Sequence, residues 1–160
     1  MRTTKVYIET TLFNFYVDED RGDAHIDTLK LFKEIADGKY EAYTSDYVID
    51  ELLLTEETKK REKMLSLISE YGIKVLEPSS DASKIAALYV AEGVIPEKYK
   101  TDGLHIAIST VYELDMIISM NFQHIVKRKT IKMTSAINTL HGYKAVEIYS
   151  PMEVVESESD

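Results

Sequence analysis

The sequence predicts an α/β protein of three layers, in which helices cover both faces of a five-stranded, mainly parallel sheet. Two observations lead to this prediction. Five short β-rich runs alternate with helical segments along the 160 residues, as in parallel sheets whose strands are joined by helices. One run, MIIS at 116–119, is continuously apolar, which is typical of a strand covered on both faces.

The first half of the chain is expected to supply three of the strands. Apolar residues at helical spacing predict a helix that stops at Gly38, and Ser45 or Asp46 can cap the helix after the second strand. The expected elements are a strand at 5–9, a short helix or turn up to residue 16, a helix at 23–36, a strand at 41–44, helices through 53 and at 55–70, and a strand at 73–76.

The second half is expected to complete the sheet with two strands. Its elements are a helix from residue 79 or 80 to Gly93, a helix from 101 or 102 to 111, a strand at 116–119, a helix at 130–140 and a strand at 145–149. The second of these helices is apolar on nearly all sides, so we expect it to be buried. Residues 1–150 are predicted to form one domain, and the Glu- and Ser-rich tail at 151–160 is predicted to be flexible.

The composition is that of a globular protein, with 44% hydrophobic and 29% charged residues. No apolar run approaches the roughly 20 residues of a membrane span, and the sequence starts without a secretory signal, so we expect a cytoplasmic location. The absence of Cys excludes disulfides, thiolate nucleophiles and Cys-based zinc sites. A net charge of −9 argues against a protein that coats nucleic acid nonspecifically, but not against a nucleic-acid enzyme with an acidic metal site.

Four oxygen-bearing side chains follow the predicted strands or open the helices near them: Glu9, Glu51, Asp102 and Asn121. Ligand and catalytic groups of open α/β sheets collect outside the carboxyl ends of the strands, so these four can converge. Carboxylate and amide oxygens suit a hard divalent cation. We therefore predict a site for Mg²⁺ or Mn²⁺, with the three acids as metal ligands and Asn121 completing the catalytic set.

Each of these acids also has an ordinary structural explanation. Glu9 can cap the turn after the first strand, and Asp102 can be the N-cap of its helix, worth about 1 kcal/mol. Asp50 could point inward in place of Glu51, although a charge within an apolar helical face is costly unless it is paired or metal-bound, which favours Glu51. Asp115 precedes the fourth strand and is expected at its far end, away from the site.

Two basic clusters, at 59–63 and 127–132, stand out against the acidic background. Both can be solvated helix faces. The second follows Asn121, so Lys127, Arg128 and Lys129 are candidate contacts for the phosphates of a substrate.

Other patterns are less informative. The four His residues lack metal-ligand spacing, and His105, one helical turn after Asp102, is expected to be a half-buried histidine with ordinary hydrogen bonds. There is no Gly-rich phosphate loop and no GxSxG motif.

The segments VYIETTLFNFY, SDYVIDEL, TDGLHIAIS and LDMIISMNFQHIV resemble the PIN-domain ribonucleases, in particular the VapC-like toxins of type II toxin–antitoxin systems. The resemblance runs from about Lys5 to Val155. It implies a sandwich with a five-stranded parallel sheet, a Mg²⁺ or Mn²⁺ site and endonucleolytic cleavage of RNA. It also implies a cognate antitoxin, a homodimer, and supporting or water-orienting roles for the hydroxyls of Thr11 and Ser119.

The sequence departs from the family at two positions, because Glu9 and Asn121 stand where Asp is common. The longer Glu can shift a metal, and the Asn removes one negative charge. We therefore keep three hypotheses: a metal-dependent endoribonuclease, a catalytically inert PIN-like module that binds RNA or protein, and a small phosphatase-like hydrolase.

Overall fold

The computed structural model describes residues 2–156, which form a five-stranded parallel sheet in the order β3-β2-β1-β4-β5. The strands are β1 (Thr4–Ile8), β2 (Tyr40–Ser45), β3 (Lys74–Leu76), β4 (Met116–Ile118) and β5 (Glu147–Tyr149). Because every neighbouring pair is parallel, all five carboxyl ends lie at the same edge of the sheet. The predicted fold class is confirmed.

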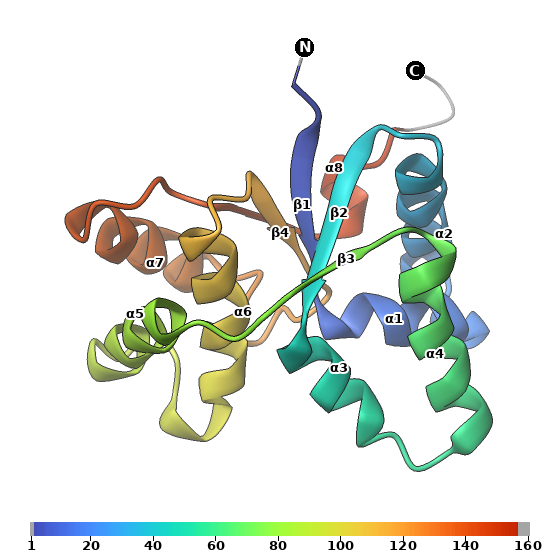
Figure 1. Ribbon diagram of the computed structural model, residues 1–160, viewed down its shortest axis with the longest axis horizontal. Coiled ribbons are helices and arrows are strands. Elements are labelled where there is room, and N and C mark those ends of the chain that lie inside the picture. Colours follow the sequence, from blue (N-terminus) through green and yellow to red (C-terminus); the bar gives the residue numbers. More distant parts are fainter. Residues whose placement is uncertain (1, 157–160) are drawn as a thin grey trace.

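Helices cover both faces of the sheet (Figure 1). One layer contains α1 (Thr10–Val17), α2 (Asp23–Ala36), α4 (Thr58–Glu70) and α8 (Pro151–Val154). The other contains α5 (Ser80–Ala91), α6 (Lys100–Val111) and α7 (Arg128–Leu140). The helix α3 (Asp46–Leu53) contacts α1 and α4 of the first layer and α6 of the second, so it bridges the two layers beside the carboxyl ends of the strands. Short 3-10 turns, η1 (Glu19–Arg21) and η2 (Glu97–Tyr99), precede α2 and α6.

The core follows the apolar pattern of the sequence. Val6, Tyr7 and Ile8 of the central strand are fully buried, as are Ile117 and Ile118 of β4, which fits strands covered on both faces.

The helix α6 is buried along most of its length, as its apolar sequence predicts. Gly103 allows α5 to approach closely, because a Cβ at this position would lie 3.3 Å from the Ile95 side chain and 3.5 Å from that of Tyr89. The amino-terminal turn of α6 is therefore fixed against α5.

The far end of the sheet holds Asp115, as predicted. Its carboxylate accepts hydrogen bonds from the Lys5 backbone amide at 2.8 Å, from Arg2 at 2.5 Å and from Lys144 at 3.1 Å. These contacts lower the pKa of Asp115 to about 2, against the opposing effect of burial. The residue joins the starts of β1 and β4 and takes no part in the site at the other edge.

The first part of the expected flexible tail is helical. Instead of fraying from residue 151, the chain forms α8, which packs against α2. Ser150 and Glu153 form a capping box and Pro151 occupies the first turn, which are strong signals for the start of a helix. The last part of the predicted tail, 157–160, lies outside the described residues.

Among residues 2–156, no helix combines the length and the hydrophobicity that a membrane span requires.

Candidate active site

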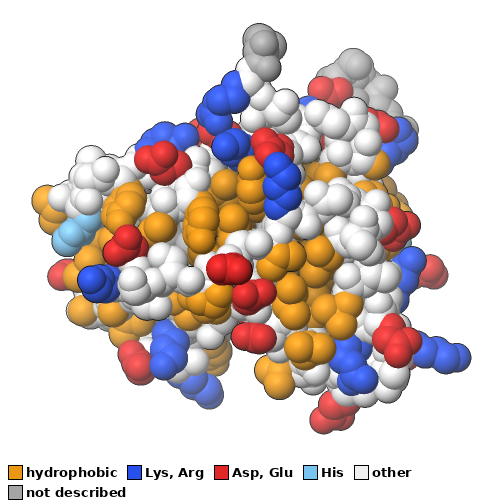
Figure 2. All heavy atoms as spheres, in the orientation of Figure 1, with side chains coloured by type: hydrophobic (Ala, Val, Ile, Leu, Met, Phe, Trp, Pro, Cys, Tyr) orange, Lys and Arg blue, Asp and Glu red, His pale blue; other side chains and the backbone are white. Residues whose placement is uncertain are grey.

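Glu9, Glu51, Asp102 and Asn121 meet at the carboxyl edge of the sheet. Glu9 directly follows β1, Glu51 lies on the helix that follows β2, and Asn121 lies three residues after the end of β4. Asp102 is in the first turn of α6, where the charge of Glu51 and the side chain of Asn121 both influence it. Figure 2 shows acidic side chains near the middle of the face in view, between hydrophobic surfaces on either side.

Glu9 is held by the protein on one of its two oxygens. Its side chain is 2% exposed, and Oε1 accepts hydrogen bonds from the Thr11 amide (3.2 Å), the Thr11 hydroxyl (2.6 Å) and the Ser119 hydroxyl (2.5 Å). The amide bond makes Glu9 the N-cap of α1, so the capping explanation and the site position are compatible. Burial raises the pKa of Glu9, and the nearby His105 and the two hydroxyls only partly oppose this effect.

Glu51, rather than Asp50, points toward the site. Asp50 is exposed, whereas Glu51 is partly buried and its Oε1 accepts hydrogen bonds from the Thr10 hydroxyl at 2.7 Å and from His105 Nε2 at 2.5 Å. Burial alone would raise the pKa of Glu51, but the hydrogen bond and charge of His105, together with Thr10, lower it. Glu51 is therefore a stable carboxylate within the site.

His105 is the residue of the site that the sequence analysis missed. We expected a half-buried histidine, but its side chain is fully buried between Glu51 and the hydroxyl of Tyr7, which lies 2.7 Å from Nδ1. The Tyr7 hydroxyl also contacts Ser45 at 2.6 Å. Burial disfavours charge on the imidazole, but the hydrogen bond and charge of Glu51 outweigh it and raise the pKa of His105.

A signal for His105 was present in the sequence. It is the one titratable side chain within the apolar stretch GLHIAIS, and it lies three positions after Asp102, on the same helical face. The cost of placing a charge in an apolar helix, which pointed to Glu51, applies equally to His105.

Asp102 does not act as the N-cap of α6, because that position is occupied by Tyr99. Burial raises the pKa of Asp102, opposed by His105 and by the side chain of Asn121. The side-chain oxygen of Asn121 already accepts a hydrogen bond from the His124 backbone amide at 3.0 Å, so the Nδ2 group of Asn121 is the donor that can face Asp102. The Asn121 side chain thus stabilises the Asp102 carboxylate and the turn that contains His124, and its oxygen is already occupied by the His124 amide.

The donor chemistry of the site fits a hard cation, but the described residues do not form a closed cage. Within residues 2–156, no group of three or more Asp, Glu or His side chains is arranged to hold a metal ion. Glu9 and Glu51 each have one oxygen bound to protein donors, which leaves the second oxygen of each without a hydrogen bond from a described residue. Mg²⁺ is commonly held by only one or two carboxylates and keeps several waters, which such an open arrangement can satisfy.

The candidate phosphate contacts Lys127, Arg128 and Lys129 are exposed at the start of α7. The backbone amides of Ile125 and Val126 donate hydrogen bonds to the backbone carbonyl of Asn121, so a tight turn connects the site to this basic cluster. None of the three cations forms an ion pair with a residue in the described part of the chain.

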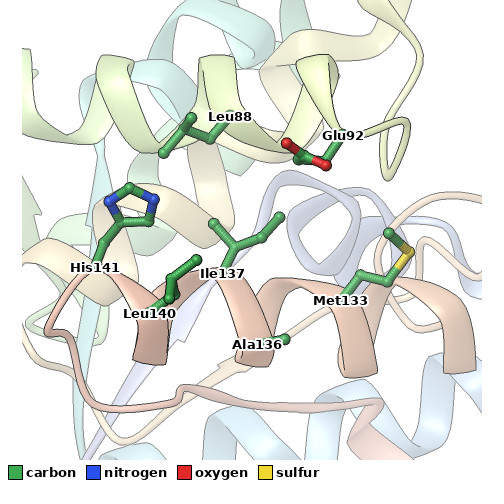
Figure 3. A pocket seen from close by; sticks show the side chains of 7 residues that line it. All are labelled: Leu88, Glu92, Met133, Ala136, Ile137, Leu140 and His141. Atoms are coloured by element: carbon green, nitrogen blue, oxygen red, sulfur yellow. The ribbon is translucent and has the colours of Figure 1, made fainter.

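An apolar groove of about 260 Å³ lies elsewhere, between α5 and α7. In Figure 3, Leu88 of α5 and Glu92, just after α5, lie across the groove from Ile137 and Leu140 of α7 and from His141, which follows α7. None of the predicted site residues lines this groove, so it is separate from the acidic site.

Comparison with known proteins shows similarity in structure but not in sequence. No protein-family model matches the chain, and no curated protein matches it. The structure is similar to VapBC2 of Rickettsia felis, solved with a DNA fragment of its promoter, with a TM-score of 0.59 and 11% identity over 92% of this chain and 98% of that chain.

Two structures from Mycobacterium tuberculosis are also similar. VapC20, a toxin that cleaves the sarcin–ricin loop, gives a TM-score of 0.55 with 12% identity over 88% of this chain and 98% of that chain. VapBC-5, of the VapBC toxin–antitoxin family, gives 0.50 with 16% identity over 92% and 98%. The protein therefore has the fold of a VapC-like PIN domain.

Proposed function

We propose that this protein is a Mg²⁺- or Mn²⁺-dependent endoribonuclease and the toxin of a toxin–antitoxin pair. The observation that carries the proposal is the meeting of Glu9, Glu51 and Asp102 at one edge of the sheet. Burial raises the pKa of two of these acids, so the protein holds negative charge where it costs free energy unless a cation compensates. The VapC-like fold supports the proposal, since VapC20 is a toxin that cleaves the sarcin–ricin loop.

The three acids would hold the cation, directly or through water. When bound, the cation supplies a water of lowered pKa for attack on the phosphodiester and stabilises the charge that develops there. The residues of the chain fix the ligands: Thr11 and Ser119 hold one oxygen of Glu9, and His105 holds one oxygen of Glu51. Each ligand is thereby oriented with its other oxygen available.

The competing function is an inert PIN-like module that binds RNA or protein. It is favoured by the contact between His105 and Glu51, which neutralises charge in the site without a metal when the imidazole is protonated. Isothermal titration with Mn²⁺ separates the two hypotheses. Binding that is lost in Glu51→Gln supports the enzyme, whereas no heat at millimolar Mn²⁺ supports the inert module.

The main test is cleavage of single-stranded RNA with Mg²⁺ or Mn²⁺, followed on denaturing gels. Glu51→Gln and Asp102→Asn should each lower the rate at least about 100-fold, because even residues that merely support metal ligands commonly contribute 10–100-fold. Asp50→Asn is the matched control, since it removes an exposed acid from the same helix and should cleave like the wild type.

All variants are purified identically, so that a contaminating ribonuclease would appear equally in each. The proposal is refuted if both site variants retain wild-type cleavage with wild-type stability, or if EDTA leaves the rate unchanged. The partner part of the proposal is tested separately, by whether a small protein encoded next to this chain co-purifies with it and suppresses cleavage.

A further inference from the structure

A stacked pair of rings lies beside the acidic site. The rings of Tyr99 and His124 are parallel to within 28°, with centroids 4.3 Å apart. Tyr99 lies three residues before Asp102, and His124 lies three residues after Asn121, whose side chain holds the His124 amide. The stack therefore joins the two segments that carry the acid and the amide of the site. The Tyr99 side chain remains 39% exposed, so its ring meets solvent at the edge of the site.

Five exposed cations lie close to this stack in the sequence, and the ammonium group of Lys98 lies over the Tyr99 ring, 5.7 Å from its centroid. None of them forms an ion pair with a described residue, although basic residues elsewhere in the molecule do. The cations are Lys98 and Lys100 on either side of Tyr99, and Lys127, Arg128 and Lys129 shortly after His124. Unpaired positive charge at this position is notable in a chain of net charge −9.

We propose that these seven residues, the Tyr99 surface, bind single-stranded RNA. An unpaired base displaces the Lys98 ammonium and stacks on the Tyr99 ring, and the phosphates on either side of the base contact these five cations. Base–aromatic stacking next to a basic track is the usual way in which proteins hold single strands, and it tolerates any base because each has a flat face. A base inside a duplex is already stacked on its neighbours and cannot use the ring. The inference rests on the proposed function and names its substrate class.

Binding of a fluorescein-labelled single-stranded RNA of about 12 nucleotides, measured by fluorescence anisotropy, tests the role of the ring. EDTA is present throughout, so neither cleavage nor metal binding contributes. Tyr99→Ala should raise Kd on the order of tenfold, the usual loss for one stacked base, whereas Tyr99→Phe keeps the ring and should bind like the wild type. A duplex of the same length should bind without sensitivity to Tyr99→Ala.

Tyr112→Ala is the matched control for the ring. Tyr112 is 42% exposed and follows the last residue of α6, so it lies at the opposite end of the helix that begins after Tyr99. Its removal should leave Kd unchanged. Thermal unfolding of each variant shows whether a loss of binding reflects a loss of structure.

The salt dependence of Kd tests the cations. Replacing Lys127 and Arg128 together by Ala should reduce the slope of log Kd against log salt concentration by about 1.4, because each phosphate contact to a single strand contributes about 0.7. Tyr99→Ala should leave this slope unchanged. Lys84→Ala, which removes an exposed unpaired cation of α5, is the control.

The inference is overturned if Tyr99→Ala binds RNA as tightly as Tyr112→Ala, or if the wild type binds no RNA. It is also overturned if Tyr99→Ala weakens the binding of an antitoxin but leaves the affinity for RNA unchanged. Its failure is distinguishable from failure of the proposed enzyme. Cleavage by the wild type with unaltered binding by Tyr99→Ala refutes only the Tyr99 surface, and the reverse result refutes only the nuclease.

Discussion

Ser119→Ala should destabilise the metal-free protein more than the loss of one buried hydroxyl normally does. The Ser119 side chain is fully buried, donates to the Glu9 carboxylate at 2.5 Å and accepts the Asn121 amide at 2.9 Å. A hydrogen bond to a charged group contributes about 1.5–3 kcal/mol, and the amide left without its partner adds about 1 kcal/mol at a partly buried position. We expect a loss of about 2–4 kcal/mol at a pH where Glu9 is ionised, or roughly 5–15 °C in Tm for a domain of this size.

The matched control is Ser109→Ala. Ser109 is also fully buried, but its hydroxyl donates to a neutral acceptor, the His105 carbonyl at 2.8 Å. The same atom is removed, so the expected cost is only about 1 kcal/mol. The difference between the two variants isolates the contribution of the Glu9 charge.

Urea unfolding in EDTA at pH 7 and at about pH 4 measures this difference. Burial raises the pKa of Glu9 above its ordinary value of 4.5, so the carboxyl group is largely protonated at about pH 4 and becomes charged only as the pH rises through the pKa of the folded protein. Losing the Ser119 hydroxyl raises this pKa further. The extra destabilisation is therefore present above the pKa of the folded protein and disappears as the pH falls below 4.5. Equal costs for Ser119→Ala and Ser109→Ala, or a difference independent of pH, would refute the reasoning.

Two further predictions concern single carboxylates. Glu9→Gln should stabilise the metal-free protein at pH 7, because the amide oxygen can still accept the three hydrogen bonds while the cost of a buried charge is removed. The gain in Tm should vanish below pH 4.5, where the wild-type carboxyl group is also neutral. Added Mn²⁺ should raise the Tm of this variant less than that of the wild type. Asp115→Asn should lose about 1 kcal/mol at pH 7, less than its pKa of about 2 implies in full, because Arg2 and Lys144 are more than half exposed and screened. This stabilisation is complete above pH 3.8 and is lost as the pH falls through 2, so urea curves that stay separated below pH 2 would contradict it.

The order of elements could be predicted because their signals are local. The helix predicted at 23–36 has those bounds, since its apolar spacing and the glycine after it need no information from the rest of the chain. The continuous apolar run MIIS likewise identified a strand covered on both faces. The helical end of the chain was not predicted, because its Glu and Ser content concealed a capping box.

The environment of the site was less predictable because it depends on contacts between distant segments. The partners of His105 are Tyr7 and Glu51, which are 98 and 54 residues away, so no local pattern reports them. The choice of Glu51 over Asp50 succeeded because the apolar helical face decided it. The alternative role of Asp102 as a cap was wrong because the preceding 3-10 turn starts the helix earlier than the apolar pattern indicates.

The central position of β1 means that the site is divided between the two halves of the chain. Glu9 and Glu51 precede residue 52, whereas Asp102, His105 and Asn121 follow residue 101, and the halves meet where β1 pairs with β4. A nascent chain leaving the ribosome therefore carries only two of these five side chains until residue 102 has been made. The site is complete only after Asn121 has been made, and a product truncated before that residue lacks it.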